Sequence, residues 1–377
     1  MKKVRLGDLV TIDSGFAFKS SLFNESEGMP IIRIRDVNSG QTNTFYSGEY
    51  DEKYIVNKGD LLIGMDGNFT IRKWDSGKAL LNQRVCRIKS NSNELSNEYL
   101  YRIMPNHLKM IEDRTPFVTV KHLSVKSIDN IELYLPSLEI QKKIANTLDK
   151  AQRLIDKRKE QIELLDELVK SRFIDMFGNI ITNSYKWDTV KLKDICMLKS
   201  GGTPSRSKPE YFKGVIPWIT TVALGKNLID GNDAVEYITQ DAVDNSATKL
   251  IPEGSLLFGM RVGVGKISVN SVPMCTNQDI MAITEIDTSK YNLIFLKKII
   301  ESYSEYFNNQ KRGATIQGIK SETLKEIKIP IIETQLQTQF VEVVEQVDKL
   351  KFEMKKSLEE LEDNLNSLMK KAFNGEL

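Results

Sequence analysis

Residues 144–176 read IANTLDKAQRLIDKRKEQIELLDELVKSRFIDM, and apolar side chains recur there in alternating steps of four and three residues. Residues 340–372 read FVEVVEQVDKLKFEMKKSLEELEDNLNSLMKKA and repeat the pattern 196 positions on, from 144 to 340. This spacing predicts two heptad-patterned helices, ended by Gly178 and Gly375. The two seams consist of Ile144, Leu148, Ala151, Ile155, Ile162, Leu165, Val169 and Met176, and of Phe340, Val344, Val347, Met354, Leu358, Leu361, Leu365, Leu368 and Ala372.

Three charged residues interrupt these seams: Arg158 and Arg172 in the first helix and Lys351 in the second. We expect them at the edge of the seam or paired with acidic residues of the facing helix. A helix of roughly 40 residues is about 60 Å long, and such helices with a narrow apolar stripe commonly pair with one another. The pattern therefore favours an antiparallel coiled coil over two helices packed only on their own globules.

The segment before each helix is also repeated. Val4–Gly15 returns as Val190–Gly201, Gly59–Met65 returns as Gly254–Met260, and Asn82-Gln83 returns as Asn277-Gln278. A unit this long indicates a duplicated domain rather than a solenoid, and a duplicated chain tends towards pseudo-two-fold symmetry. Short apolar runs between turn residues predict an α+β globule. We expect strands at 29–34, 59–64, 84–88 and 128–135, and a helix over 97–110.

Composition restricts the possible functions. Charged residues make up 28% of the 377 residues and the net charge is only +2, so nucleic-acid binding requires local basic surfaces. Cys86, Cys196 and Cys275 lie far apart, which indicates neither a disulfide framework nor a zinc site. His107 and His122 lack metal-spaced partners, although the segment around His122 is a candidate for DNA contact. Because no apolar run is long enough for a membrane span, we expect a soluble cytoplasmic protein.

Signatures of catalysis are missing from the sequence. A methyltransferase needs a glycine-rich cofactor loop and an Asn/Asp-Pro-Pro-aromatic tetrad, and neither is present. Residues 259–268, GMRVGVGKIS, resemble a phosphate loop, but the glycine spacing fails and Ile267 occupies the position of the magnesium-binding hydroxyl. We therefore expect no enzymatic activity, no bound cofactor and no metal site in this chain.

Several short motifs occur along the chain, and their order is informative. They are the Leu-x-Asp openings, Gly201-Gly202-Thr203-Pro204-Ser205, Pro217-Trp218-Ile219, and the helix start at 136–145, PSLEIQKKIA. In this order, and with this duplication, the whole chain resembles the specificity subunit of type I restriction-modification enzymes. The second helix start, which follows Pro330, departs from the family pattern by two extra residues.

The resemblance implies a role in recognition and assembly. Residues 1–136 and 185–331 would be target recognition domains, each reading one part of a split double-stranded DNA sequence. Residues 137–178 and 332–375 would be spacer helices, whose antiparallel coiled coil sets the gap between the two parts. The chain itself would be non-catalytic. It would dock two modification subunits that use S-adenosylmethionine and, through them, restriction and translocase subunits that use ATP and magnesium.

Candidate DNA-binding residues fall in three corresponding places of the two halves. Bases are read by paired donors and acceptors, whereas phosphates need only cations and small hydroxyls. We also expect Arg33 and Arg35 to project from one face of a strand. The candidates are Lys19, Ser20, Arg33, Arg35, Asn68, Arg72, Lys73, Arg114, Thr119 and Lys121 in the first half, and Thr203, Ser205, Arg206, Arg261, Lys266, Lys311, Arg312, Thr315 and Gln317 in the second.

Two other classes of function stay open from the sequence. A two-headed adaptor that binds only proteins would share the same helices and globules, but it would not bind DNA in a salt-dependent manner. A stand-alone nuclease would cleave plasmid with magnesium and no partner. The sequence does not reveal the bases read, the gap length, or which half reads which segment.

Overall fold

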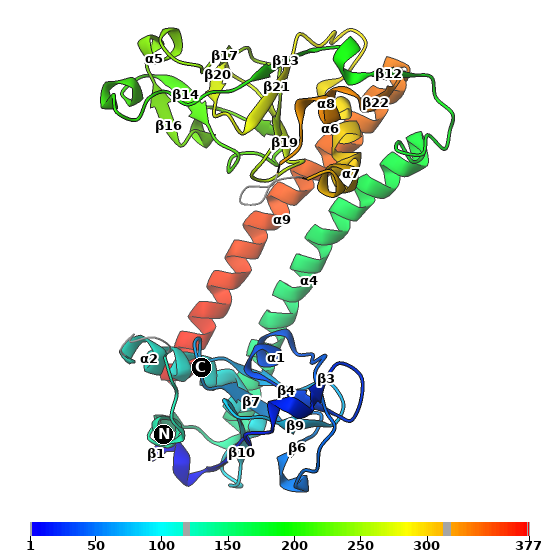
Figure 1. Cartoon of the computed structure of the whole chain (residues 1–377). Coiled ribbons are helices and arrows are strands. Elements are labelled where there is room, and N and C mark those ends of the chain that lie inside the picture. The colour runs from blue at the N-terminus through cyan, green and yellow to red at the C-terminus, as the bar shows by residue number, and fades with distance from the viewer. Residues whose placement is uncertain (1, 116–120, 312–317, 375, 377) are drawn as a thin grey trace. The chain divides into compact units, whose positions relative to one another are not determined.

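The computed structural model describes residues 2–115, 121–311, 318–374 and 376. The chain forms two compact units, Met1–Gln161 with Met354–Leu377, and Ile162–Glu353 (Figure 1). Two long helices, α4 (Leu138–Phe177) and α9 (Thr334–Asn374), contribute a segment to each unit. Each unit is therefore a globule together with one stretch of each helix.

The globule of the first unit contains an antiparallel sheet of four strands in the order β2-β10-β7-β8. Its central strand β7 is buried along its whole length. A second sheet has the order β3-β5-β4-β9-β6, and β1 pairs with β11. The strands are β1 (Lys2–Arg5), β2 (Val10–Ser14), β3 (Phe23–Asn24), β4 (Met29–Ile32), β5 (Phe45–Tyr46), β6 (Ile55–Val56), β7 (Leu61–Gly64), β8 (Ile71–Lys73), β9 (Ala79–Leu81), β10 (Val85–Ser90) and β11 (Glu132–Leu135).

Three helices complete this globule: α1 (Ile34–Ser39), α2 (Asn97–Arg114) and α3 (Val125–Asp129). The helix expected over 97–110 is confirmed as α2. The strand expected over 29–34 is wrong beyond Ile32, because Asp36 accepts a hydrogen bond from the Arg33 backbone N–H (2.8 Å) and starts a helix. Gly40, at φ 77°, ends that helix. Arg33 and Arg35 therefore flank or occupy a helix, not a strand.

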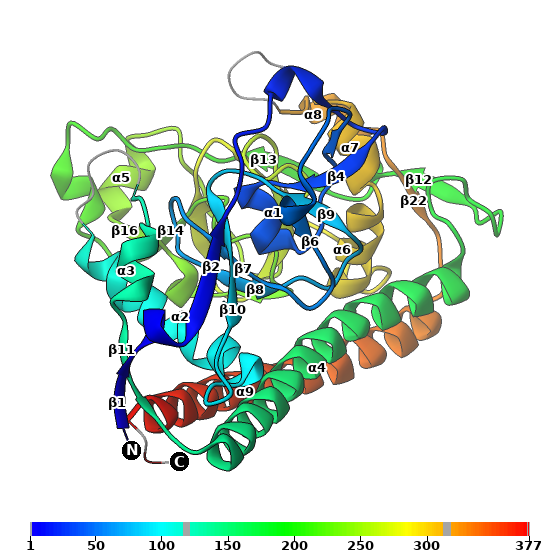
Figure 2. The ribbon, with the colours of Figure 1, turned by 90° about the horizontal axis from the view of Figure 1, so that it is seen from below.

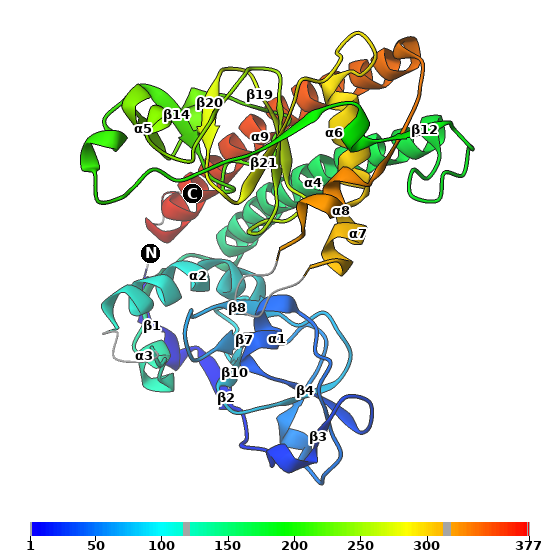
Figure 3. The same ribbon diagram turned by 45° about the horizontal axis from the view of Figure 1, so that its top comes forward.

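The second unit repeats this plan. Its main sheet has the order β13-β21-β18-β19-β15, and a smaller sheet has the order β16-β14-β20-β17. The helices α6, α7 and α8 lie together on one side of the unit (Figure 3). The elements are β12 (Thr189–Lys191), β13 (Met197–Ser200), β14 (Ile216–Ile219), β15 (Leu228–Ile229), β16 (Glu236–Ile238), α5 (Gln240–Asp244), β17 (Leu250–Ile251), β18 (Leu256–Gly259), β19 (Ile267–Asn270), β20 (Met274–Thr276), β21 (Ile280–Thr284), α6 (Leu293–Ser302), α7 (Ser304–Asn309), α8 (Ser321–Lys325) and β22 (Lys328–Pro330), which pairs with β12.

Within each unit the segments of α4 and α9 lie side by side and run antiparallel (Figure 2). In the first unit, Ile144 and Leu148 near the start of α4 pack with Leu368 and Ala372 near the end of α9. In the second unit the end of α4 packs with the start of α9. The same clusters include globule residues, so the helix ends pack on their globules as well as on one another. The predicted antiparallel pairing is confirmed inside each unit.

The seam of α4 shifts near its end. Arg172 is exposed and pairs with Asp175 of its own helix (2.7 Å), whereas the adjacent Phe173 and Phe177 are buried against Phe340. The shift follows from geometry, because a straight helix with 3.6 residues per turn drifts away from a 3.5-residue repeat. The seam predicted through position 172 is therefore wrong at that position.

The other two interruptions differ from one another. Arg158 is half-buried and donates to Gln161 of its own helix (3.2 Å), which fits the expected position at the edge of the seam. Lys351 instead pairs with Asp166 of the facing helix (2.5 Å), as expected. Only one of the three interrupting charges therefore contributes to the pairing of the helices.

A fully buried glutamine fixes the start of each long helix to its globule. The Gln141 amide donates to the Glu94 and Pro136 carbonyls (2.7 and 2.9 Å), and its oxygen accepts from the Ser96 N–H (2.9 Å). Gln337 makes the same three bonds with the backbones of Lys290, Ile332 and Asn292 (2.8, 2.7 and 2.9 Å). Every partner lies 196 positions from its counterpart, so the two extra residues expected at the second helix start do not exist. The proline alone is displaced.

Candidate nucleic-acid interface

Four loop segments meet at one end of the main sheet of the first unit. The register places the end of β2, the end of β7 and the start of β10 together, because Ser14 lies opposite Cys86 and Gly64 lies opposite Val85. Met65 N–H donates to the Arg84 carbonyl (2.9 Å), and Leu123 N–H donates to the Met65 carbonyl (2.7 Å). We call these segments, 15–20, 65–68, 82–84 and 121–123, the first loop cluster.

The second unit builds the same arrangement from corresponding residues. Gly201 N–H donates to the Ile280 carbonyl (3.1 Å), Met260 N–H to that of Asp279 (2.8 Å), and Ile319 N–H to that of Met260 (2.9 Å). Each bond has its counterpart in the first unit. We call the segments 201–208, 260–266, 277–279 and 318–319 the second loop cluster.

An ionic group of three side chains lies at the centre of the first loop cluster. Arg84 Nε lies 3.4 Å from Asp66 Oδ2, and His122 Nδ1 lies 2.6 Å from Asp66 Oδ1. Arg84 Nη1 lies 3.4 Å from His122 Nδ1. Arg84 has a positive φ of 72°, a conformation that is unusual for a residue other than glycine. Two of these residues, Asp66 and Arg84, were not expected to belong to the site.

The corresponding ionic group of the second loop cluster has two charged members, Arg261 and Asp279, whose Nη1 and Oδ1 atoms lie 3.5 Å apart. The Thr203 hydroxyl donates to the Gln278 side-chain oxygen and ties the loop after β13 to this segment. Gln83 and Gln278 are exposed at equivalent positions of the two clusters. The repeated Asn-Gln pair in the sequence was the signal that could have revealed this segment.

The clusters bring several of the predicted DNA-binding residues together. These residues are exposed in the described structure, and they leave their polar groups available to a ligand at the edges of the loops. They are Lys19, Ser20 and Asn68 in the first cluster, and Arg261 and Lys266 in the second. Ser205 belongs to the second cluster too, where its hydroxyl lies 2.8 Å from that of Ser207.

Other predicted residues have a structural task instead. Arg72 donates to the Val37 and Asn38 carbonyls (both 2.6 Å) at the end of α1, and Lys121 donates to the Glu112 carbonyl (2.7 Å) in the last turn of α2. Arg206 makes a two-bond ion pair with Glu236 (2.6 Å each) and stacks 4.2 Å above the Phe212 ring. In these bonds the side chains use the N–H donors that they would need to contact a DNA base.

Three more candidates lie apart from the loop segments. Lys73 ends β8 opposite Leu61, so it is at the other end of the sheet. Arg35 contacts Thr44 and Asp36 (3.2 and 3.5 Å), and Arg114 is exposed in the last turn of α2.

Some candidates lie at the limits of the described residues. Lys311 is half-buried at the end of one described range. Thr119, Arg312, Thr315 and Gln317 lie outside the described residues. Their roles stay predictions.

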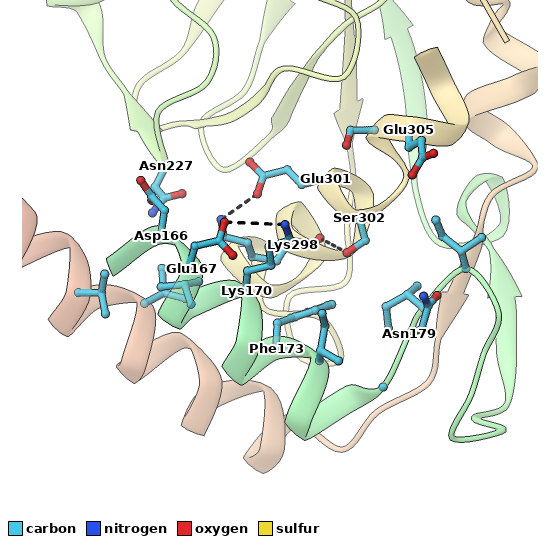
Figure 4. Close-up of a pocket in the computed structure, with 18 of the residues that line it drawn as sticks. Asp166, Glu167, Lys170, Phe173, Asn179, Asn227, Lys298, Glu301, Ser302 and Glu305 are labelled. Atoms are coloured by element: carbon cyan, nitrogen blue, oxygen red, sulfur yellow. Dashed lines mark hydrogen bonds and ion pairs between the residues drawn. The ribbon is translucent and has the colours of Figure 1, made fainter. Parts of the chain in front are cut away.

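A cavity lies in the second unit, where α4 ends beside α6 and α7 (Figure 4). It has a volume of about 570 Å³ and contains Glu301, which pairs with Lys298 (2.9 Å) and with the buried Lys297. Burial lowers the pKa of Lys297, although the Glu301 carboxylate opposes that shift. The acidic side chains of this cavity are largely neutralised by lysines, which is a structural arrangement rather than an acid–base pair.

Among the described residues, no group of three or more His, Cys, Asp or Glu side chains could hold a metal ion. Burial raises the pKa of the Cys86 and Cys196 thiols to about 12, so both stay protonated and unreactive near neutral pH. None of the helices in the described part is long and apolar enough to cross a membrane.

Comparison with known proteins identifies the class to which this architecture belongs. The family described as type I restriction modification DNA specificity domain matches the chain twice, over residues 1–164 and 185–363. The chain belongs to this family. The predicted family and fold class, two similar α+β globules each followed by a long helix, are thereby confirmed.

Individual relatives carry the same designation. The chain is 42% identical over 169 residues to the specificity subunit of the type I restriction enzyme EcoBI from Escherichia coli, an alignment that covers 45% of this chain and 36% of the relative. It is 26% identical over 319 residues to the EcoR124I/EcoR124II specificity subunit from the same organism, covering 81% and 76%. The chain thus spans about a third of the EcoBI subunit and three quarters of the EcoR124I subunit.

The fold is also found in a solved structure. The crystal structure of the type I restriction-modification S subunit from M. genitalium has a TM-score of 0.56 at 17% identity, covering 99% of this chain and 96% of that one. At this identity the likeness concerns the fold alone.

Proposed function

We propose that this chain is the DNA-sequence specificity subunit of a type I restriction-modification system and reads a bipartite double-stranded target. One observation carries the proposal: both units build the same loop cluster on the same backbone bonds, yet present different polar side chains on it. Equivalent frames with different donors and acceptors suit two different half-sites. Membership of the specificity-domain family supports the same conclusion.

The two long helices would set the gap between the half-sites. No insertion separates their registers, since every seam position from 144 to 176 keeps the same offset of 196 from its counterpart between 340 and 372. A residue inserted into such a helix rotates everything beyond it by about 100° and disrupts the seam. Helices that keep their length in this way suit a spacer.

The chemistry of the system would reside in partner subunits. We propose that this cytoplasmic chain is non-catalytic and holds no cofactor, that it docks two modification subunits using S-adenosylmethionine, and that restriction and translocase subunits using ATP and magnesium join through them. Phosphate contacts by exposed cations of the clusters, such as Lys19 and Lys266, would supply salt-dependent affinity. A protein-only adaptor would not bind random duplex DNA at any salt concentration.

Mapping methylated motifs across a genome tests the proposal. Exchange of residues 1–136 for those of a relative should change one half-site and leave the other unchanged. A heptad inserted after Ile162, with a second after Met354, lengthens each helix by about 10 Å and should widen the unread gap by at most about three base pairs. Methylation that stays the same in both variants would contradict the proposal.

A further inference from the structure

The ionic pair at the centre of each loop cluster is reversed between the two units. Asp66 and Arg261 are equivalent, because each follows the methionine whose N–H donates to the same neighbouring segment. Arg84 and Asp279 are equivalent, because their carbonyls accept those bonds. The aspartate and the arginine have therefore exchanged places. The arginine is on the 82–84 segment in the first unit and on the 260–266 segment in the second.

The exposure and spacing of the pair are similar despite the exchange, although Asp66 faces Nε of Arg84 and Asp279 faces Nη1 of Arg261. The arginine side chain is 55% exposed in both units, while the carboxylate is 25% exposed as Asp66 and 19% as Asp279. The closest nitrogen–oxygen distances are 3.4 Å and 3.5 Å. Each cluster thus presents a half-exposed guanidinium with a largely covered carboxylate behind it.

A third position has changed together with the pair. Position 122 is histidine where position 318 is glycine, and both lie against the residue that follows the methionine. A Cβ atom at Gly318 would lie 2.8 Å from Cγ of Arg261 and 2.9 Å from the Met260 carbonyl oxygen, so the second unit has no space for a side chain at this position. In the first unit His122 instead lies against Asp66.

Stability does not account for a pair of this kind. An exposed Arg–Asp pair contributes little to folding, typically below about 1 kcal/mol. A guanidinium has five N–H donors, and a carboxylate that occupies one side orients the donors left on the other side. An oriented pair of N–H groups matches O6 and N7 of guanine in the major groove.

We propose that Arg84 and Arg261 each read a guanine, one in each half-site, and that Asp66 and Asp279 are their positioning residues. This inference rests on the proposed function and deepens it. Because the guanidinium starts from a different loop in each unit, the guanine falls at a different place within each half-site. The exposed amide of Gln83 lies next to Arg84 along the chain and suits an adjacent adenine.

Selection from a pool of randomised duplex DNA, with the full chain assembled with its modification subunits, tests the inference. Arg84→Lys keeps the charge but not the two-bond fork, and should relax the preference for one guanine of one half-site by roughly 5- to 100-fold. Arg261→Lys should do the same in the other half-site. Arg5→Lys is the matched control, because Arg5, the last residue of β1, pairs with Asp8 (2.9 Å) and is also 55% exposed.

A second variant separates reading from folding. The triple exchange Asp66→Arg, Arg84→Asp and His122→Gly rebuilds in the first unit the arrangement of the second. It should keep the thermal midpoint within a few degrees and shift the selected guanine within the first half-site. Selection of the original guanine by this variant would overturn the inference.

The remaining outcomes are distinguishable. Weaker binding to all sequences with a smaller salt slope would assign Arg84 to a phosphate and overturn the inference. Unchanged selection by Arg84→Lys would overturn it as well, while the bipartite consensus of the unaltered complex would still support the proposed function. If that complex itself selects no consensus, the proposed function fails.

Discussion

The two units share a frame and differ in what they display on it. Gln141 and Gln337 make the same three bonds at the same offset, and the backbone bonds around Met65 recur around Met260. On that common frame the Asp66–Arg84 pair is reversed as Arg261–Asp279. The hydrogen bonds of the frame have stayed alike while exposed polar groups have exchanged. The comparison separates residues that hold the fold from residues that face a ligand.

The packing around the helices also differs between the units. In the second unit Phe340 lies among Phe173, Phe177 and Phe295, at ring distances of 5.2, 5.6 and 6.3 Å. The equivalent residue of the first unit is Ile144, which packs in an aliphatic cluster with Leu148 and Ala372. The helices therefore pack through aromatic side chains in the second unit and through aliphatic side chains in the first.

The largest expected effect is in the aromatic cluster. Phe340→Ala should lower the free energy of unfolding by about 3–5 kcal/mol, because a fully buried ring is removed. Hydrogen exchange should accelerate in β18 of the second unit and stay slow in β7 of the first. Phe352→Ala, on the same helix but 69% exposed, is the control and should change stability by less than about 0.5 kcal/mol. Equal acceleration in both units would show that they unfold together.

Gln141 and Gln337 should respond alike to substitution if the two units share the same set of hydrogen bonds. Gln141→Ala or Gln337→Ala removes three hydrogen bonds and leaves buried backbone groups unpaired, so each should cost about 3 kcal/mol by urea unfolding. Gln→Glu should cost more at neutral pH, since a carboxylate cannot donate to the two carbonyls and would be fully buried. If the loss of unfolding free energy differed by more than about 2 kcal/mol between the two variants, the two glutamines would not be equivalent.

Mild acid should weaken the first unit only. Burial lowers the pKa of His107 from 6.5 to about 4, so the unfolded chain takes up the proton at a higher pH than the folded chain. Stability is then full above about pH 6.5 and falls as the pH drops towards 4, by about 2 kcal/mol between pH 7 and pH 5. The equivalent residue is Tyr303, which does not titrate in that range. His107→Tyr should abolish this part of the pH dependence; an unchanged slope would refute it.

Much of the fold could be predicted because its signals are local and repeated. The heptad spacing, the glycine after each helix and the duplicated segments predicted the two globules and the paired helices. The helix α1 was missed, because the run at 29–34 is apolar and short. Only the hydrogen bond from the Arg33 N–H to the Asp36 carboxylate shows that the chain turns there. The seam error at Arg172 has a similar origin, because helix drift depends on what the helix end packs against.

The candidate site was predictable only in part. Lys19, Ser20 and Asn68, from the first two predicted places, lie on loops that meet at the sheet end because strand register brings those loops together, whereas most of the third place lies outside the described residues. The reversed pair was not predicted, because the sequence does not show that the residue after each repeated methionine lies beside the residue after each repeated Asn-Gln pair. Likewise, nothing in the local sequence shows that Arg72 and Arg206 bind carbonyls and a carboxylate of their own unit.

The division of the helices between the units has a consequence for synthesis on the ribosome. The unit that contains the first globule also contains residues from Met354 onwards, which are synthesised after the second globule. Its cluster includes Leu365, Leu368 and Ala372, so the first globule stays uncovered on that side until these residues have emerged. A message cut short before codon 354 would therefore damage the first globule as well as remove the end of α9.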